Sequence, residues 1–415
     1  MGGGLIQLSA YGSQDVYLTG NPQITFFKSV YYRHTNFSME SVEVGFNGDP
    51  DFGQTVTCTI PKNGDLVHQI YLEVTLPQLD QNNTDGSGNA ATYVSWVNSI
   101  GHALIKNVEV QIGNEVVDKH YGEWLDIYSN LTVPESKRLA FNNMIGRFAG
   151  PAVGPHYAES ERTFFIPLQF WFCRNIANAV PIVALQHQDI KLKFVFRQLR
   201  ELIKSDKEIT SITSSSATAS LSATLYVNYI YLDNKERRKF VKGDHEYLIE
   251  QLQYDGEESI SLNASNFSAS LSYSHPIKEI IWTITKESNY NINYSSTGND
   301  IFNYRPSIGQ EFLTANFKFN GINRFNPRKP DYFKLVQPFE HHTYAPADKY
   351  IYVYSFALRP EEHQPSGTCN MSLLDQATIH FTFPSTISNS ILRVYAINYN
   401  ILRIVSGLSG LAFNN

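Results

Sequence analysis

The chain of 415 residues has few charged residues and few cysteines. Only 17% of it is charged, and its net charge of −6 gives no general attraction to phosphate backbones, so we expect no direct nucleic-acid binding. Its three cysteines, Cys58, Cys173 and Cys369, lie far apart and form no CxxC pair. The sequence therefore predicts buried free thiols in a reducing compartment, without a disulfide framework or a cysteine zinc site.

Long apolar runs are also missing. A membrane-spanning helix needs roughly 18 to 20 apolar residues, and the longest apolar stretch here is "FFIPLQFWF" at Phe164–Phe172. The first residues, "MGGGLIQLSA", contain neither a basic n-region nor a continuous apolar h-region. These patterns predict a soluble protein without a Sec-type signal.

The usual catalytic motifs are absent from the sequence. It contains no GxGxxG, GxxxxGK[ST] or GxSxG, and "GNPQITFFK" lacks the second glycine of a phosphate loop. "HEYLI" at His245–Ile249 has Ile where a zinc-protease helix needs its second His. His341 and His342, next to Glu340, would point to opposite sides of a strand, so we expect a solvated loop there. The sequence predicts no enzyme activity, cofactor, metal or small-molecule substrate.

What the chain does contain is alternation of apolar and polar residues. Tyr (25) and Phe (26) are abundant, and segments of period two recur between turn residues, as in half-buried strands. We expect eight strands in the first half, at Ser41–Phe46, Thr55–Ile60, Gln69–Leu76, Asn107–Ile112, Thr163–Phe172, Pro181–Leu185, Asp189–Phe196 and Thr224–Leu232. Eight more are expected at Tyr247–Tyr254, Phe267–Ser274, Lys278–Thr285, Ala315–Asn320, Tyr350–Leu358, Cys369–Leu374, Ala377–Phe383 and Arg393–Ile404.

Helical periodicity is scarce. Only Lys119–Leu131, Pro134–Ile145 and Asn234–Lys242 are expected to be helical. The last of these holds a basic cluster (Lys235, Arg237, Arg238, Lys239 and Lys242), which we interpret as a solvated connector or as a contact with an acidic partner or subunit. Long polar loops are expected at Leu79–Ala91, Lys204–Ser220 and Ser288–Asp300.

The two sets of strands match each other in order and pattern. "VEVQIGN" at Val108–Asn114 resembles "ANFKFNG" at Ala315–Gly321, since both alternate and end in a Gly/Asn pair. "FIPLQFW" resembles "YSFALRP", and "LQHQDIKLKFVF" resembles "LLDQATIHFTF" in all but its last apolar position. Low identity with preserved order indicates a duplicated module.

The predicted fold class is therefore all-β, with two consecutive eight-stranded antiparallel jelly rolls and a few short helices in loops. We expect five parts. They are an N-terminal arm at 1–24, a first jelly roll at 25–233, a helical connector at 234–246, a second jelly roll at 247–404 and a C-terminal segment at 405–415.

Several motifs occur together and in order along nearly the whole chain. After the opening segment they are "NGDL" (Asn63–Leu66), "DKHYGEW" (Asp118–Trp124), "HEYLIEQLQ" (His245–Gln253), "YSFALRP" (Tyr354–Pro360), "PSGTCNMS" (Pro365–Ser372) and "NYNILRIVSGLSGLAF" (Asn398–Phe413). With this set the sequence resembles the major capsid proteins of nucleocytoplasmic large DNA viruses, most closely those of algal viruses.

That resemblance implies a virion protein, made and assembled in the host cytoplasm. It implies a homotrimeric, pseudo-hexagonal capsomer that tiles an icosahedral shell, with the terminal segments on the inner face toward minor capsid proteins and an internal viral membrane. The candidate assembly contacts lie in the aromatic N-terminal stretch, where Pro22 turns the chain toward the first strand. They are Tyr11, Asp15, Tyr17, Asn21, Pro22, Phe26 and Phe27.

Two other functions stay open at this stage. Jelly rolls also occur in glycan-binding and glycan-cleaving proteins, which would need a cleft lined by aromatic side chains and two carboxylates. A minor capsid or spike component of the same fold is the other alternative.

Overall fold

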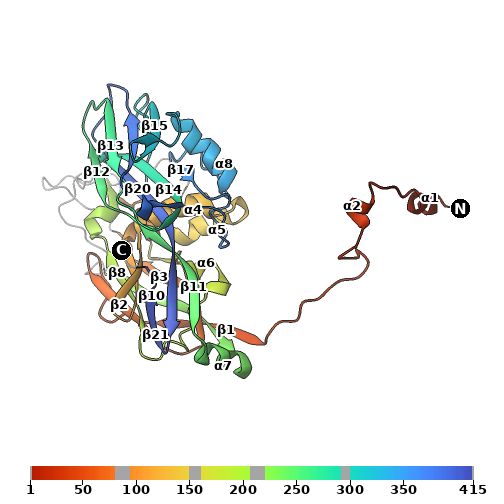
Figure 1. The fold of residues 1–415 in the computed structure, drawn as a ribbon. Helices are drawn as coiled ribbons and strands as arrows, with labels where there is room; N and C mark the ends of the chain where they lie inside the picture. The colour runs from red at the N-terminus through yellow and green to blue at the C-terminus, as the bar shows by residue number, and fades with distance from the viewer. Residues whose placement is uncertain (1, 80–93, 149–159, 206–219, 291–299, 414–415) are drawn as a thin grey trace. The chain divides into compact units, whose positions relative to one another are not determined.

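The computed structural model describes residues 2–79, 94–148, 160–205, 220–290 and 300–413 (Figure 1). The chain divides into two units, Met1–Asn36 and Phe37–Asn415, and the second unit contains all the strands that the structure describes. The three polar loops expected from the sequence fall almost entirely outside the described residues.

The first β module consists of two antiparallel sheets that share one apolar core. One sheet has the order β1 (Phe37–Val44), β10 (Ser222–Leu232), β3 (Leu66–Leu76) and β7 (Arg162–Pro167). The other has the order β2 (Thr55–Ile60), β8 (Ile190–Phe196), β5 (Ile105–Ile112) and β6 (Glu115–Tyr121). The strands alternate as expected, because every second residue of β8 is buried in the core between the sheets.

The second β module has the same plan with extra strands at its edges. Its larger sheet has the order β11 (His245–Gln253), β20 (Ser390–Val405), β14 (Pro276–Lys286) and β17 (Tyr352–Ser355), joined by β12 (Glu257–Ile260), β18 (Cys369–Asn370) and β21 (Leu408–Leu411). Its smaller sheet has the order β13 (Asn266–Ser270), β19 (Ala377–Thr382), β15 (Thr314–Phe319) and β16 (Ile322–Asn323). The predicted double jelly roll is confirmed.

The predicted duplication is visible in the sheet orders. The matched segments form β5 and β15, β7 and β17, and β8 and β19, and each pair occupies the same position in its sheet. The Gly/Asn pairs that follow β5 and β15 each form a two-residue hairpin turn; φ is positive at Gly113 in the first turn and at both Asn320 and Gly321 in the second. Identical strand order in both halves supports descent of both modules from one repeated unit.

Some strand predictions were wrong. Pro181–Leu185 forms a turn, in which the Ala184 amide donates to the Pro181 carbonyl, and not a strand. The sheet of β2, β8 and β5 is completed by β6. This strand was not predicted, because the following helix was expected to begin at Lys119. Cys369–Leu374 is a strand only at its first two residues and then becomes a 3-10 turn.

Apart from α1 and α2, which precede the first strand, the helices lie in connections between strands. The predicted ones are α4 (Gly122–Thr132), α5 (Glu135–Ile145) and α7 (Asn234–Lys242), and α8 (Gln337–His341) with the π-turn before it (η4, Tyr332–Val336) was not anticipated. The remaining short elements are α1 (Gly3–Ser9), α2 (Val16–Thr19), β4 (Val94–Trp96), α3 (Ile100–Leu104), α6 (Trp171–Arg174), η1 (Ile176–Asn178), η2 (Leu199–Leu202), β9 (Ile203–Ser205), η3 (Glu287–Tyr290) and η5 (Met371–Leu373). In Figure 1, α4 and α5 lie at the level where the two modules meet.

Candidate functional site

The predicted assembly contacts lie in the first unit, which exposes most of its apolar side chains. Tyr17, Phe26 and Phe27 are 92%, 90% and 97% exposed. Tyr11 is also exposed, and Asp15 accepts a hydrogen bond from the Gly12 amide at 2.7 Å, which stabilises the turn before α2. The two short helices were missed because neither has the length or the apolar periodicity that identifies a helix from sequence.

Asn21 and Pro22 follow Gly20, the residue that caps the end of α2. Asn21 has a φ of 50°, in the left-handed region that Asn tolerates better than most residues, and Pro22 fixes the next φ. The chain therefore changes direction where the sequence predicted a turn. Large apolar side chains exposed on one segment commonly mark a surface that another molecule covers.

A second functional feature is the junction between the two modules, which is built around α4. All residues of α4 from Gly122 to Leu131 are buried. Its apolar side chains form one cluster with residues of the second module, consisting of Trp124, Ile127, Tyr128, Leu131, Ile281, Tyr304, Ile351, Val353, Tyr395 and Ile397. Trp124 and Tyr395 have ring centroids 5.4 Å apart. An apolar contact of this kind holds the modules as one body, in contrast to the polar interfaces of mobile domains.

The "DKHYGEW" motif lies at this junction, and several of its residues have structural roles there. Asp118 accepts a hydrogen bond from the Leu252 amide at 3.0 Å, which links β6 to β11. A side chain at Gly122 would collide with the carbonyl oxygens of Ile105 and His102, so only glycine lets α4 start there. Glu123 pairs with Arg197 at 2.6 Å. The motif therefore helps to join the modules and to place the start of α4.

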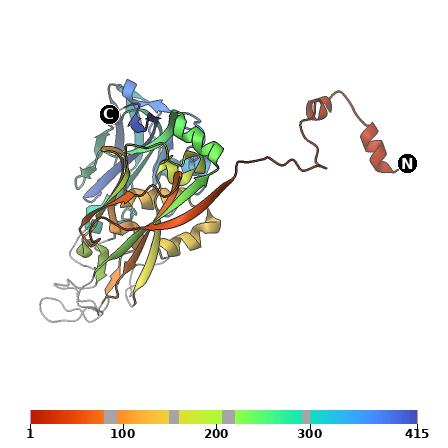
Figure 2. The same cartoon turned by 90° about the horizontal axis from the view of Figure 1, so that it is seen from below.

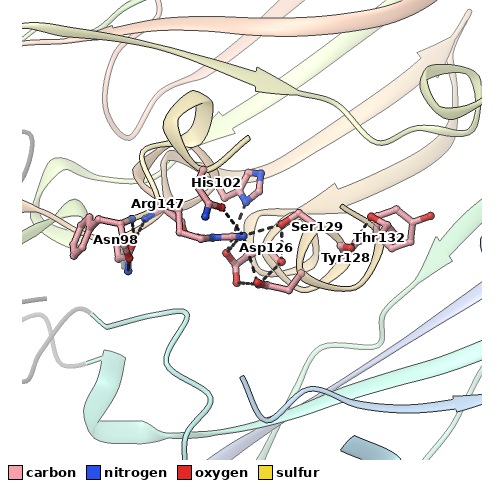
Figure 3. A network of polar contacts seen from close by, with 11 residues as sticks. Asn98, His102, Asp126, Tyr128, Ser129, Thr132 and Arg147 are labelled. Carbon is pink, nitrogen blue, oxygen red and sulfur yellow. Dashed lines mark hydrogen bonds and ion pairs between the residues drawn. The ribbon is translucent and has the colours of Figure 1, made fainter. Parts of the chain in front are cut away.

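A buried polar network stabilises the other side of α4 (Figure 3). Arg147, which follows α5, donates from Nη2 to Asp126 Oδ1 at 2.5 Å and from Nε to Ser99 Oγ at 3.0 Å. Asn130 and Ser129 of α4 complete the network. Burial by itself would raise the pKa of Asp126, but the charge of Arg147, with help from His102, holds it at about 2. Asp126 is therefore ionised at neutral pH, and Arg147 compensates its buried charge.

A second ionic cluster crosses the junction. Glu250 of β11 lies 2.7 Å from Arg174 of α6 and 2.8 Å from Lys278 of β14. Lys278 is completely buried and also donates to the Pro360 carbonyl at 2.5 Å, while Arg174 donates to the Tyr128 hydroxyl at 2.6 Å. Burial favours the neutral form of Glu250, but the two cations lower its pKa by more than burial raises it. These contacts fix one module against the other, because they join elements of both.

The solvated loop expected at His341 and His342 was wrong. His341 ends α8, and the side chain of His342 is fully buried between two carboxylates. Its Nε2 lies 3.1 Å from Glu279, and its Nδ1 lies 2.9 Å from Glu361 Oε1. Burial would lower the pKa of His342, but the two carboxylates raise it to about 9. The histidine is therefore charged at neutral pH and joins β14 to the segment after β17.

This arrangement predicts a loss of stability in mild alkali. Because the folded pKa of His342 is above its ordinary value, its contribution is complete below about pH 6.5 and disappears as the pH rises through about 9. The shift corresponds to about 3 kcal/mol. In the wild-type chain, urea unfolding should give a lower free energy of unfolding at about pH 9 than at about pH 6.5. In His342→Gln, whose side chain cannot be charged, the difference between the two pH values should be much smaller. An equal fall in both proteins would contradict the assignment.

The structure does not support the alternative chemistries. Among the described residues, no group of His, Cys, Asp and Glu is arranged to hold a metal ion. "HEYLI" lies in strand β11, not in a helix, and the side chain of His245 contacts the Phe240 carbonyl. Cys58 and Cys173 are buried free thiols, as predicted, and burial raises the pKa of Cys58 to about 11 and that of Cys173 to about 12. Cys369 is also free but only half-buried. In the described part of the chain, no helix is long and apolar enough to cross a membrane.

Two cavities near the junction bear on the glycan alternative. The larger, of about 570 Å³, contains Tyr71, Tyr128 and Phe141, but Glu361 is the one carboxylate among its described lining residues. The smaller, of about 190 Å³, contains both Glu250 and Glu361. Both carboxylates are already paired with buried cations, so neither is an available acid or nucleophile of the kind that glycoside cleavage requires.

Comparison with known sequences identifies the family. A family described as "Major capsid protein N-terminus" matches residues 25–233, and one described as "Large eukaryotic DNA virus major capsid protein" matches residues 236–410. The chain belongs to the major capsid proteins of large eukaryotic DNA viruses. The resemblance inferred from the ordered motifs is confirmed. Like other members of this family, the protein is a capsid component of the virion.

Individual relatives cover the whole chain. The major capsid protein of Pyramimonas orientalis virus is 44% identical, and that of Paramecium bursaria Chlorella virus 1 is 35% identical, each alignment covering 100% of both proteins. The solved structure of a protein in the PBCV-1 virus capsid, a quasi-atomic model, matches with a TM-score of 0.77 and 30% identity over 94% of this chain and 100% of that one. The Faustovirus major capsid protein, at 15% identity and a TM-score of 0.74, shares the fold.

Proposed function

We propose that three copies of this capsid protein form a homotrimeric, pseudo-hexagonal capsomer, which tiles an icosahedral shell. The observation that carries this proposal is the repeated sheet order of the two modules. Two similar modules in each of three chains give six similar corners, and closed symmetric assembly requires such repeated lateral surfaces. The buried ionic and apolar junction supports the proposal, because it holds the two corners of each chain at a constant angle.

Solution mass and images test the capsomer. Light scattering should give three times the chain mass, and negative-stain images should show hexagonal particles. A stable monomer without such particles at high concentration would contradict the proposal. A control variant with one exposed polar change far from the junction, Ser38→Ala, should keep the trimer mass.

The finer assignments belong to this proposal as well. We propose an arm at 1–24, jelly rolls at 25–233 and 247–404, a connector at 234–246 and a C-terminal segment at 405–415. Neighbouring capsomers, minor capsid proteins and an internal viral membrane are the proposed partners, and the host cytoplasm is the proposed site of synthesis and assembly. A purely structural role without enzyme activity is consistent with the paired state of the cavity carboxylates.

The alternative of a minor capsid or spike component makes a different prediction about abundance. Quantitative proteomics of purified virions should find this chain as the most abundant shell protein. A copy number limited to the vertices would favour the alternative.

A further inference from the structure

The contact between the two modules is head-to-tail, because it joins two different kinds of surface. One surface is the side of α4 formed by positions i, i+3, i+4 and i+7, which are Trp124, Ile127, Tyr128 and Leu131. Leu125 of the same helix packs instead in the core cluster of the first module. The other surface is a sheet face of the second module. A head-to-tail contact uses one helix and one sheet face, so a chain of two modules leaves one of each unused.

The sheet face under α4 is the outer face of the larger sheet of the second module. Its central row consists of cross-strand neighbours from β20, β14 and β17, which are Tyr395, Ile281 and Val353. All three are buried and belong to the same apolar cluster as the α4 residues. Ile280 and Trp282, on the inner face, pack in the core of the second module. With α4 in place, both faces of this sheet are therefore buried along its central row.

The corresponding sheet face of the first module lacks this burial. The order β1, β10, β3 and β7 repeats the order β11, β20, β14 and β17. The strand register gives two outward rows in this sheet, Thr224–Glu73–Phe165 and Tyr226–Tyr71–Pro167. All six side chains are at least partly exposed, and Phe165 is 41% exposed. We call these six residues the open sheet face.

The unused helix lies in the second module. The segments η4 and α8 together form residues 332–341, in the connection before β17, as α4 lies in the connection before β7. We call residues 332–341 the second-module helix. It repeats the spacing of the α4 contact residues, i, i+3, i+4 and i+7, with Tyr332, Leu335, Val336 and Phe339. Phe333 packs in the core of its own module, as Leu125 does.

The second-module helix, unlike α4, exposes these contact residues. Leu335, Val336 and Phe339 are 38%, 40% and 82% exposed, whereas their counterparts in α4 are buried. Grouped apolar side chains on a surface commonly mark a site that another molecule covers. The junction inside the chain shows what fits such a helix, namely the outer face of a sheet with this strand order. A second copy of the chain supplies that face.

The charges favour a contact between these two different surfaces over a contact between two identical sheet faces. The open sheet face includes Glu73, and Glu43 of β1 pairs with Tyr226 in the strand register. Two copies of this face placed together would bring carboxylates toward one another. Residues 328–341 contain three basic and two acidic residues, so this segment carries a net positive charge and suits the anionic sheet face.

We propose that the second-module helix of one copy packs on the open sheet face of the next copy. The inference rests on the proposed capsomer and names the contact that closes it. Three such contacts between chains, together with the α4 junction inside each chain, complete a closed ring of six modules. Figure 1 shows α8 at the surface of the second module, and Figure 2, seen from below, shows the first module toward the viewer.

Light scattering of full-length variants tests the contact. The helix variant Val336→Asp/Phe339→Asp and the sheet variant Phe165→Asp/Tyr226→Asp each replace two accessible apolar or aromatic side chains. Each variant should raise the concentration at which half of the chains are trimeric by roughly a hundredfold or more. Trimers of either variant at the concentrations that suffice for the wild type would overturn the contact.

Mixing the two variants tests its head-to-tail direction. The helix variant keeps an intact sheet face, and the sheet variant keeps an intact helix, so one contact can form between them. At high concentration the mixture should contain dimers of twice the chain mass, while each variant alone stays monomeric. Such dimers would also show that both variants are folded. A mixture without dimers would overturn the head-to-tail contact.

A matched control and the wild-type chain separate this contact from the capsomer. Leu262→Asp/Ile308→Asp replaces two exposed apolar side chains of other second-module segments and should form trimers within about twofold of the wild-type concentration. An equal loss in this control would overturn the assignment to these surfaces. Trimers in the wild type and in both interface variants would contradict only the contact. Wild-type dimers or open chains that both interface variants dissociate would contradict only the capsomer, and a monomeric wild type would contradict both.

Discussion

Replacing Arg147 with methionine is expected to lower the free energy of unfolding by about 3–5 kcal/mol. The substitution keeps most of the volume of the side chain but leaves the ionised carboxylate of Asp126 buried without its cation. An uncompensated buried charge costs far more than a lost surface pair. Urea or guanidinium unfolding of the full chain at neutral pH measures the effect.

Two controls identify the cause of that loss. Arg359→Met removes a surface cation that is 71% exposed and pairs with Glu362, so it should change stability by less than about 1 kcal/mol. Adding Asp126→Asn to Arg147→Met removes the buried charge and should restore part of the stability. If the double variant is no more stable than Arg147→Met, the cost comes from packing and not from charge.

The pH dependence provides an independent readout of the same pair. The folded pKa of Asp126, about 2, is below the ordinary value near 3.8, so the ion pair stabilises the fold above about pH 3.8 and is lost as the pH falls through about 2. Without Arg147, burial favours protonated Asp126. The difference in the free energy of unfolding between the wild type and Arg147→Met should therefore become smaller at acid pH.

Deleting Met1–Ile24 is expected to leave trimers intact and to prevent most shells from closing. The deleted segment exposes large apolar side chains, while the modules and their junction lie entirely in the unit that starts at Phe37. Buried aromatic anchors dominate the energy of protein interfaces, so the yield of closed shells should fall roughly tenfold or more. Electron microscopy counts shells, and light scattering measures trimers.

Point variants at Phe26 and Phe27, which the deletion keeps, test whether the exposed aromatic side chains in the rest of this unit also contribute to shell assembly. Phe26→Ser/Phe27→Ser changes two of the most exposed aromatic residues and should reduce shell yield in the full-length chain. Gln23→Ala/Ser29→Ala, in the same stretch, should assemble normally. Loss of trimers in the deletion variant would contradict the separation between arm and capsomer contacts.

Short-range patterns predicted most of the strands. The alternation in Ile190–Phe196 identified β8. Its similarity to Ala377–Phe383 correctly predicted that β8 and β19 hold equivalent positions in the two modules. Strand Glu115–Tyr121 was missed, because its "HY" end runs directly into the apolar pattern of α4. The boundary between β6 and α4 depends on the close approach of Gly122 to backbone carbonyls of another segment, and the local sequence pattern does not show that contact.

The residues of the candidate sites also differ in whether a local sequence pattern could predict their environment. Exposure of Phe26 and Phe27 followed from an apolar stretch without alternation, a local property. The burial of His342 did not follow from any local pattern. Glu279 and Glu361, which stabilise its charged form, belong to different segments of the chain. The position of Arg147 beside Asp126 was equally invisible in the sequence.

The sequence by itself determined the fold class, the duplication and the capsid family, because alternation, turn residues and ordered motifs are properties of neighbouring residues. Only the tertiary structure decided which charges are buried and paired, and that the basic residues of α7 face solvent. The physical reason is that burial and ion pairing depend on contacts between distant segments, which no short stretch of sequence encodes.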